Sequence, residues 1–113
     1  MAIKIEEKDG VQVLRINGAM DQYTLTILDE NVKDLMKRKG SRFFVLNMVD
    51  VTDISSSGVG RILTIYKDLE SKEGKLVLAD LSAVVEYVLD LARLADILPA
   101  YRDEADAIAA CRP

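Results

Sequence analysis

Hydrophobic positions alternate between two periods along the chain, and this alternation predicts strands and helices in turn. Apolar residues at every second position, around an Asp9-Gly10 turn, predict an opening β-hairpin over residues 3–16. Apolar residues spaced three and four apart predict a helix over 25–36, which Gly40 would end. A nearly continuous apolar run over 41–48 predicts a strand that is covered on both faces.

The second half of the chain continues in the same way. Helical spacing recurs over 59–69 and 84–92, on either side of a predicted strand over 75–79. Residues 97–101 predict a short last strand, which Pro99 restricts to a sheet edge or a strand start because proline cannot donate to a strand ladder.

A final helix is expected from a cap at Asp103 through Ala110. The predicted order is therefore β-β-α-β-α-β-α-β-α, which indicates an α/β fold with a mostly parallel or mixed sheet and helices packed against it. With 113 residues and no linker or repeat, the chain is expected to be one domain over residues 1–113.

Composition excludes several classes of function. The net charge is −4, and the basic run Lys37-Arg38-Lys39 falls at a helix end, where cations complement the helix dipole. Nucleic acid is therefore not the expected ligand. Cys111 has no second cysteine to pair with, and residues 1–8 hold no long apolar stretch. We expect a cytoplasmic protein with no signal peptide and no segment inserted in a membrane.

Three consecutive serines, Ser55 to Ser57, mark the turn between a buried strand and a helix. Gly58 and Gly60 follow them and keep the turn open, so that a hydroxyl is presented to another molecule. A helix start has unpaired backbone N–H groups and a partial positive charge, which suit a phosphate or a partner's acidic group.

Catalysis at this turn has little support. A serine nucleophile needs a base, and the chain has no histidine, while Lys67 is expected to face solvent. The sequence Gly58-Val59-Gly60-Arg61 lacks the spacing and the lysine of a P-loop. Asp21, Asp50 and Asp53 lack the His or paired Cys of strong metal sites. The sequence predicts no enzyme, no metal and no cofactor, and favours a binding surface that phosphorylation could switch.

The same segment resembles a known signature. Residues 51–63 are similar to the hydrophobic-D-S-S-G-hydrophobic-G motif of the STAS domain, which sulfate transporters and bacterial anti-sigma factor antagonists share. Further likenesses cover almost the whole chain: Gly18-Ala19-Met20-Asp21 before the first helix, Val45-Leu46-Asn47-Met48 as a strand with a terminal Asn, and Ile97 to Tyr101 followed by an acidic stretch and Ala105 to Ala110. The resemblance implies a STAS-like fold whose helices pack mainly on one face of a mixed sheet.

For a chain of this length the resemblance implies an anti-sigma factor antagonist. Such a protein, when unphosphorylated, binds an anti-sigma factor that is often a serine kinase, and thereby releases a sigma factor. Serine phosphorylation ends the interaction and a serine phosphatase restores it. The modified serine maps onto Ser57, with Ser56 as second choice. Ser55 stands where the family has an Asp that would orient the serine, and Asp53 is the nearest substitute.

Capping is the alternative role for these serines: Ser57 suits an N-cap, and Ser56 suits it better if the helix begins near Ser57. The expected partner-binding surface consists of Met20, Asp21, Asp53, Ile54, Ser55, Ser56, Ser57 and Gly58, with Met20 and Ile54 as its exposed hydrophobic residues. Two other functions stay open. One is an adaptor or scaffold without a switch, in a signalling complex or a lipid-transport system. The other is a binder of nucleotide or another small ligand at the serine turn.

Overall fold

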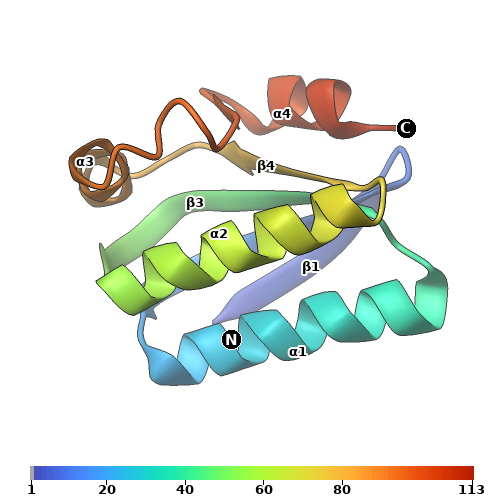
Figure 1. Ribbon diagram of the computed structural model, residues 1–113, viewed down its shortest axis with the longest axis horizontal. Coiled ribbons are helices and arrows are strands. Elements are labelled where there is room, and N and C mark those ends of the chain that lie inside the picture. Colours follow the sequence, from blue (N-terminus) through green and yellow to red (C-terminus); the bar gives the residue numbers. More distant parts are fainter. Residues whose placement is uncertain (1) are drawn as a thin grey trace.

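The computed structural model describes residues 2–113, which form a five-stranded mixed sheet flanked by four helices (Figure 1). The elements are β1 (Ile3–Lys8), β2 (Val11–Met20), α1 (Gln22–Lys39), β3 (Phe43–Ile54), α2 (Ser56–Ser71), β4 (Lys75–Ala79), α3 (Ala83–Leu91), β5 (Ala100–Tyr101) and α4 (Glu104–Cys111). The predicted order of strands and helices is confirmed.

The sheet has the strand order β1-β2-β3-β4-β5. β1 and β2 are antiparallel and meet at Asp9 and Gly10, whose φ angles of 53° and 79° close a tight turn. All other neighbouring strands are parallel, so the carboxyl ends of β2, β3 and β4 lie toward the same edge of the sheet. Gly40 ends α1 in the left-handed region, at a φ of 67°, as the sequence predicted.

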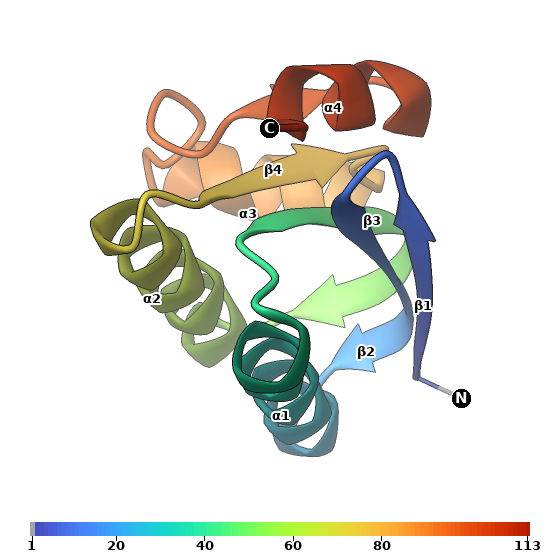
Figure 2. The same cartoon turned by 90° about the vertical axis from the view of Figure 1, so that its right-hand side faces the viewer.

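Two hydrophobic clusters lie on opposite faces of the sheet. The larger one joins α1, α2 and α3 to the sheet through residues such as Leu28, Ile62 and Leu89. The smaller one joins α4 to the other face through Ile108 and Cys111 (Figure 2). The helices therefore pack mainly on one face, as the resemblance implied. Cys111 is fully buried there, which the sequence did not predict for a residue so near the chain end.

β3 is longer than predicted. It continues past Asn47 to Ile54, because β2 pairs with it as far as Met20 opposite Ile54, while β4 pairs with it only as far as Asn47 opposite Ala79. The expectation that Asn47 ends the strand is therefore wrong.

Two further differences concern the loops around these strands. Asp50 and Asp53 lie on the extended part of β3, beyond the predicted strand over 41–48. The last strand, β5, is shorter than the predicted span over 97–101, and it begins directly after Pro99, whose carbonyl accepts the N–H of Leu78.

Candidate functional site

The candidate site lies where β2 and β3 end side by side. Met20 and Ile54, the last residues of the two strands, are paired in register. In each case a single residue separates the strand from the helix that follows: Asp21 before α1 and Ser55 before α2. The two helices therefore begin next to each other at one edge of the sheet, on the left of Figure 1.

Ser55 is the N-cap of α2. Its Oγ accepts a hydrogen bond from the N–H of Gly58 at 3.2 Å, and its carbonyl accepts the N–H of Val59 at 3.1 Å. Its extended backbone, with φ −92° and ψ 171°, is typical of this position. The alternative in which Ser56 or Ser57 caps the helix is therefore wrong, because α2 begins at Ser56 and Ser55 is its cap.

Ser56 and Ser57 occupy the first turn of α2, and both are exposed. Since Ser55 provides the cap, the hydroxyls of Ser56 and Ser57 are not needed for it. The first turn of a helix presents unpaired backbone N–H groups and the positive end of the helix dipole. A hydroxyl held here is accessible to another protein, and a negative charge added to it would be tolerated by the helix.

Asp21 caps α1 as Ser55 caps α2. Its Oδ1 accepts the backbone N–H of Thr24 at 2.9 Å, and this hydrogen bond lowers the pKa of the Asp21 carboxyl. Asp53 is also exposed, and its Oδ1 accepts the N–H of Ile54 at 2.9 Å. Two carboxylates and three hydroxyls thus surround the point where the two helices begin.

Met20 and Ile54 are buried, with 1% and 6% of their surfaces exposed, so the prediction that they are exposed hydrophobic residues is wrong. As the last inward-facing residues of paired strands, they belong to the main core. Gly58 is buried above them, and a Cβ added to it would lie 2.9 Å from Cγ1 of Ile54. These three residues hold the start of α2 close against the sheet.

Tyr23 provides the exposed hydrophobic surface at this end of the molecule. It follows the Asp21 cap by two residues, and 72% of its surface is exposed. The sequence carried a signal for this. Tyr23 stands two residues before Leu25, the first residue of the core-facing stripe of α1, and residues two apart on a helix do not share a face.

Within residues 2–113, no group of three His, Cys, Asp or Glu side chains is arranged to hold a metal ion. Asp21, Asp50 and Asp53 therefore do not form such a group.

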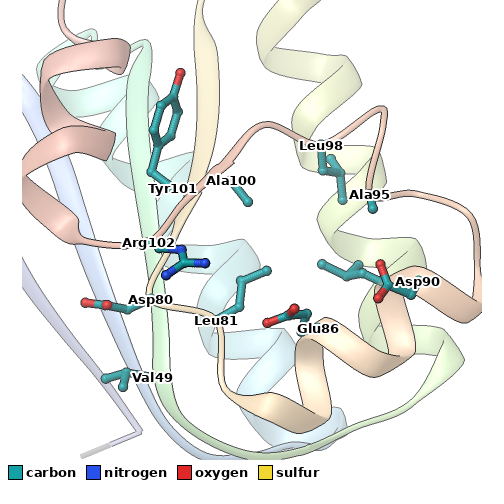
Figure 3. Close-up of a pocket in the computed structure, with 11 residues that line it drawn as sticks. Val49, Asp80, Leu81, Glu86, Asp90, Ala95, Leu98, Ala100, Tyr101 and Arg102 are labelled. Carbon is teal, nitrogen blue, oxygen red and sulfur yellow. The ribbon is translucent and has the colours of Figure 1, made fainter.

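A separate hollow of about 550 Å³ lies beside α3, near the carboxyl ends of β4 and β5 (Figure 3). Glu86 and Asp90 of α3 line one side of it, and Arg102 lies across the hollow from them. Asp80 also belongs to the lining, so acidic side chains outnumber basic ones. The three serines are not part of this hollow.

A polar cluster under the start of α4 was missed by sequence reasoning. Arg15 Nη2 lies 2.7 Å from Glu104 Oε2, and the buried Asn47 donates through Nδ2 to Glu104 at 2.9 Å and to Asp80 at 3.2 Å. The Arg15 hydrogen bond is the main cause that lowers the pKa of Glu104 to about 2. The cluster ties β2, β3 and α4 together, and its members are too far apart in sequence to predict.

None of the four helices, over the part of the chain that the structure describes, is long and apolar enough to cross a membrane.

Comparison with known proteins gives consistent results. The chain is 29% identical over 108 residues to the anti-sigma F factor antagonist of Paenibacillus polymyxa, with 96% of this chain and 92% of that protein covered. It is 36% identical over 75 residues to sulfate transporter 1.2 of Arabidopsis thaliana, a match that covers 64% of this chain and 12% of the transporter.

Among solved structures, the protein TM1081 of Thermotoga maritima, which is named for a proposed role as an anti-sigma factor antagonist, superimposes with a TM-score of 0.88 at 27% identity, covering 98% of this chain and 95% of the other. The unphosphorylated form of the anti-sigma factor antagonist SpoIIAA superimposes with a TM-score of 0.80 at 20% identity, covering 96% of each chain, and shares the fold. The family model of the STAS domain matches residues 2–107. The chain belongs to the STAS domain family.

Proposed function

We propose that this chain is an anti-sigma factor antagonist that works as a switchable binding protein and not as an enzyme. In this proposal the unphosphorylated chain binds an anti-sigma factor in the cytoplasm and thereby releases a sigma factor. The full-length likeness to the Paenibacillus polymyxa antagonist supports this assignment. The observation that carries it is the placement of Ser57, which is exposed in the first turn of α2 while Ser55 performs the capping.

Ser57 is the proposed phosphate acceptor, with Ser56 as the second choice. A phosphate adds about −1.5 to −2 charges and three acceptor oxygens. At the start of α2 this charge would be stabilised by the helix dipole, so the domain would stay folded. The phosphate would instead weaken the complex, because the partner surface packed against the hydroxyl would meet both its bulk and its charge.

The proposed binding surface consists of the exposed side chains around the two helix starts. Asp21, Asp53, Ser55 and Ser56 surround Ser57, and Tyr23 adds an aromatic side chain to the same end. Aromatic residues are common energetic centres of protein interfaces. Met20, Ile54 and Gly58 are buried beneath this surface, and their packing fixes how closely α2 approaches the sheet.

A second function, that of an adaptor without a switch, is favoured by one observation. Ser55 replaces the Asp of the STAS signature, and its Oγ is engaged in the cap. A kinase that needs the missing carboxylate would leave Ser57 unmodified. The chain would then bind its partner constantly, as a scaffold in a signalling complex or as an accessory of a lipid-transport system.

The test is a phosphorylation assay with the candidate serine-kinase anti-sigma factor and ATP, read by intact mass and by mapping the modified residue. We expect one phosphate on Ser57, none on a Ser57→Ala variant, and an unchanged gain on Ser56→Ala. Phosphorylation should release the partner, and a serine phosphatase should restore binding. Stable binding without any phosphate gain would instead establish the adaptor. If the chain neither bound the partner nor gained a phosphate, both proposed functions would be rejected.

A further inference from the structure

We propose that the groove between α1 and α2 binds an acidic amphipathic helix of a protein partner. The two helices lie side by side on the same face of the sheet (Figures 1 and 2), and the groove between them has a volume of about 810 Å³. This surface, called the α1–α2 groove below, needs neither the hydroxyl of Ser57 nor a phosphate on it. The proposal therefore goes beyond the switch described above.

Charge is the first argument. The chain as a whole has 15 basic and 19 acidic residues, but the groove reverses this balance. Five cationic side chains line the groove, and only two carboxylates do: Lys33, Lys37, Arg42, Arg61 and Lys72 against Asp29 and Asp68. A surface with a local positive excess on a negatively charged protein attracts an acidic partner selectively.

The pairing within the groove leaves two of these cations free for a partner. The carboxylate of Asp29 forms ion pairs with both Lys33, at an N–O distance of 3.3 Å, and Arg61, at 2.8 Å. The carboxylate of Asp68 forms an ion pair with Lys72 at 2.7 Å. Among residues 2–113, Lys37 and Arg42 have no carboxylate within ion-pair distance, and Arg42 donates only to backbone carbonyls. Carboxylates of a partner would therefore find two cations that are not yet neutralised.

The shape and floor of the groove indicate the kind of acidic partner. A narrow apolar strip lies at the floor between the charged walls and consists of Val32, Met36 and Ile65. Val32 and Ile65 are buried in the core, so the half-buried Met36 offers most of the accessible surface of this strip. Arg61 of α2 and Lys72, the residue that caps the end of this helix, are 11 positions apart, which places them roughly 16 Å apart along the helix axis. A small anion would reach only part of this length. An amphipathic helix of about three turns would bury its apolar stripe on the strip and direct its carboxylates to both walls.

Other polyanions match the groove less well. Asp29 and Asp68 lie within it and would repel a continuous phosphate backbone, and a flat lipid surface cannot reach the apolar strip between two helices. The hollow beside α3 carries Asp80, Glu86 and Asp90, so it would repel the same acidic helix. The two hollows thus differ in charge sign, which directs an acidic segment to the α1–α2 groove.

The experiment uses the full chain and a fluorescein-labelled 18-residue helical peptide, with leucine at positions three and four apart and glutamate on its remaining face. Binding is measured by fluorescence anisotropy, and the contacted residues are located by amide chemical-shift changes. We expect shifts concentrated at Met36, Thr64 and Ile65. Lys37→Glu should weaken binding about fivefold to tenfold, because an attractive contact becomes repulsive.

Lys67→Glu is the matched control, because Lys67 is an exposed α2 lysine outside the groove, and it should change affinity by less than about twofold. Thermal melts of both variants verify folding, and Ser57→Ala should bind the peptide as wild type does, which separates this result from the switch. Equal affinity of wild type and Lys37→Glu would overturn the proposal. So would shifts outside the groove, or tighter binding of single-stranded DNA or phosphatidylglycerol vesicles through Lys37.

Discussion

Arg61 of α2 and Asp29 of α1 form an ion pair in which Nη1 and Oδ2 lie 2.8 Å apart. The carboxylate of Asp29 also pairs with Lys33, which lies one turn further along α1. Asp29 would therefore remain paired if Arg61 turned to another anion. Ser57 precedes Arg61 by four residues, and side chains at this spacing are neighbours on a helix surface. A phosphate on Ser57 would therefore compete with Asp29 for the guanidinium of Arg61.

This competition can be measured with a double-mutant cycle of Asp29→Asn and Arg61→Gln. In the unmodified protein we expect a coupling free energy of about 0.5–1 kcal/mol, since the side chains are only 26% and 33% exposed. After phosphorylation of Ser57 the coupling should fall toward zero. Urea unfolding gives the four free energies in each state. The exposed Lys72–Asp68 pair serves as control, and an unchanged Arg61–Asp29 coupling would contradict the competition.

Replacing Ser55 and replacing Ser57 should have different effects on the stability of the protein. Ser55→Ala removes the cap of α2 and should lower the free energy of unfolding by about 1 kcal/mol. Ser57→Ala should change it by less than about 0.5 kcal/mol, because an exposed residue of the first turn is replaced by a better helix former. Chemical denaturation of the two variants checks this. If Ser57→Ala proved the more destabilising of the two, the assignment of the cap to Ser55 would be wrong.

Ser55→Asp tests the departure from the family signature. Aspartate is as good an N-cap as serine, so the variant should unfold at the same urea concentration as wild type. It also restores the carboxylate that the STAS signature places two residues before the acceptor. We expect faster phosphorylation of Ser57 by the cognate kinase, measured as initial rates. Ser55→Asn, an equally good cap without the charge, is the control and should leave the rate unchanged.

Acid stability should depend on Glu104. Its pKa is lowered from 4.5 to about 2, so its contribution to stability is complete above pH 4.5 and is lost as the pH falls toward 2. Glu104→Gln should therefore lower the free energy of unfolding near pH 6, on the order of 2 kcal/mol after allowance for partial exposure. The difference from wild type should narrow as the pH falls through this window. Urea titrations at pH 6, 4 and 3 measure it, and a constant difference would argue against the charge as its cause.

The thiol of Cys111 should be inert in the folded protein. Burial raises its pKa to about 11, and Sγ lies 3.4 Å from the carbonyl oxygen of Phe44. Reaction with Ellman's reagent at pH 8 should be at least about a hundredfold slower in buffer than in denaturing urea, since both access and the thiolate fraction are lower. Rapid labelling of the native chain would show that α4 detaches from the sheet.

Local sequence patterns predicted most of the fold correctly. Alternating and helical periods gave the order of elements, and turn residues such as Gly40 marked their ends correctly. The start of α2 was less certain from sequence because three consecutive serines are each acceptable caps. Only the strand that precedes them decides between the three, and β3 runs to Ile54 because β2 continues beside it.

The missed parts of the site depend on tertiary contacts. Met20 and Ile54 border polar turn residues in sequence, yet α2 covers them, because Gly58 allows the helix to approach closely. Asn47 looked like a strand end, and its contact with Glu104 joins residues 57 positions apart. No short-range pattern contains information of this kind.

The unequal pairing of β3 has a consequence for association between copies. Beyond Asn47 its β4 side has no partner strand within residues 2–113. The Met48 carbonyl accepts the N–H of Ser82, and the Val49 N–H donates to the side chain of Asn47, so the sheet edge without a strand partner begins at Asp50. Open edges template the growth of intermolecular sheets. Asp50 and Asp53 lie exposed on this stretch, where strand addition by a second copy would bring like charges together. We therefore expect the acidic residues before the serine turn to disfavour this kind of aggregation as well.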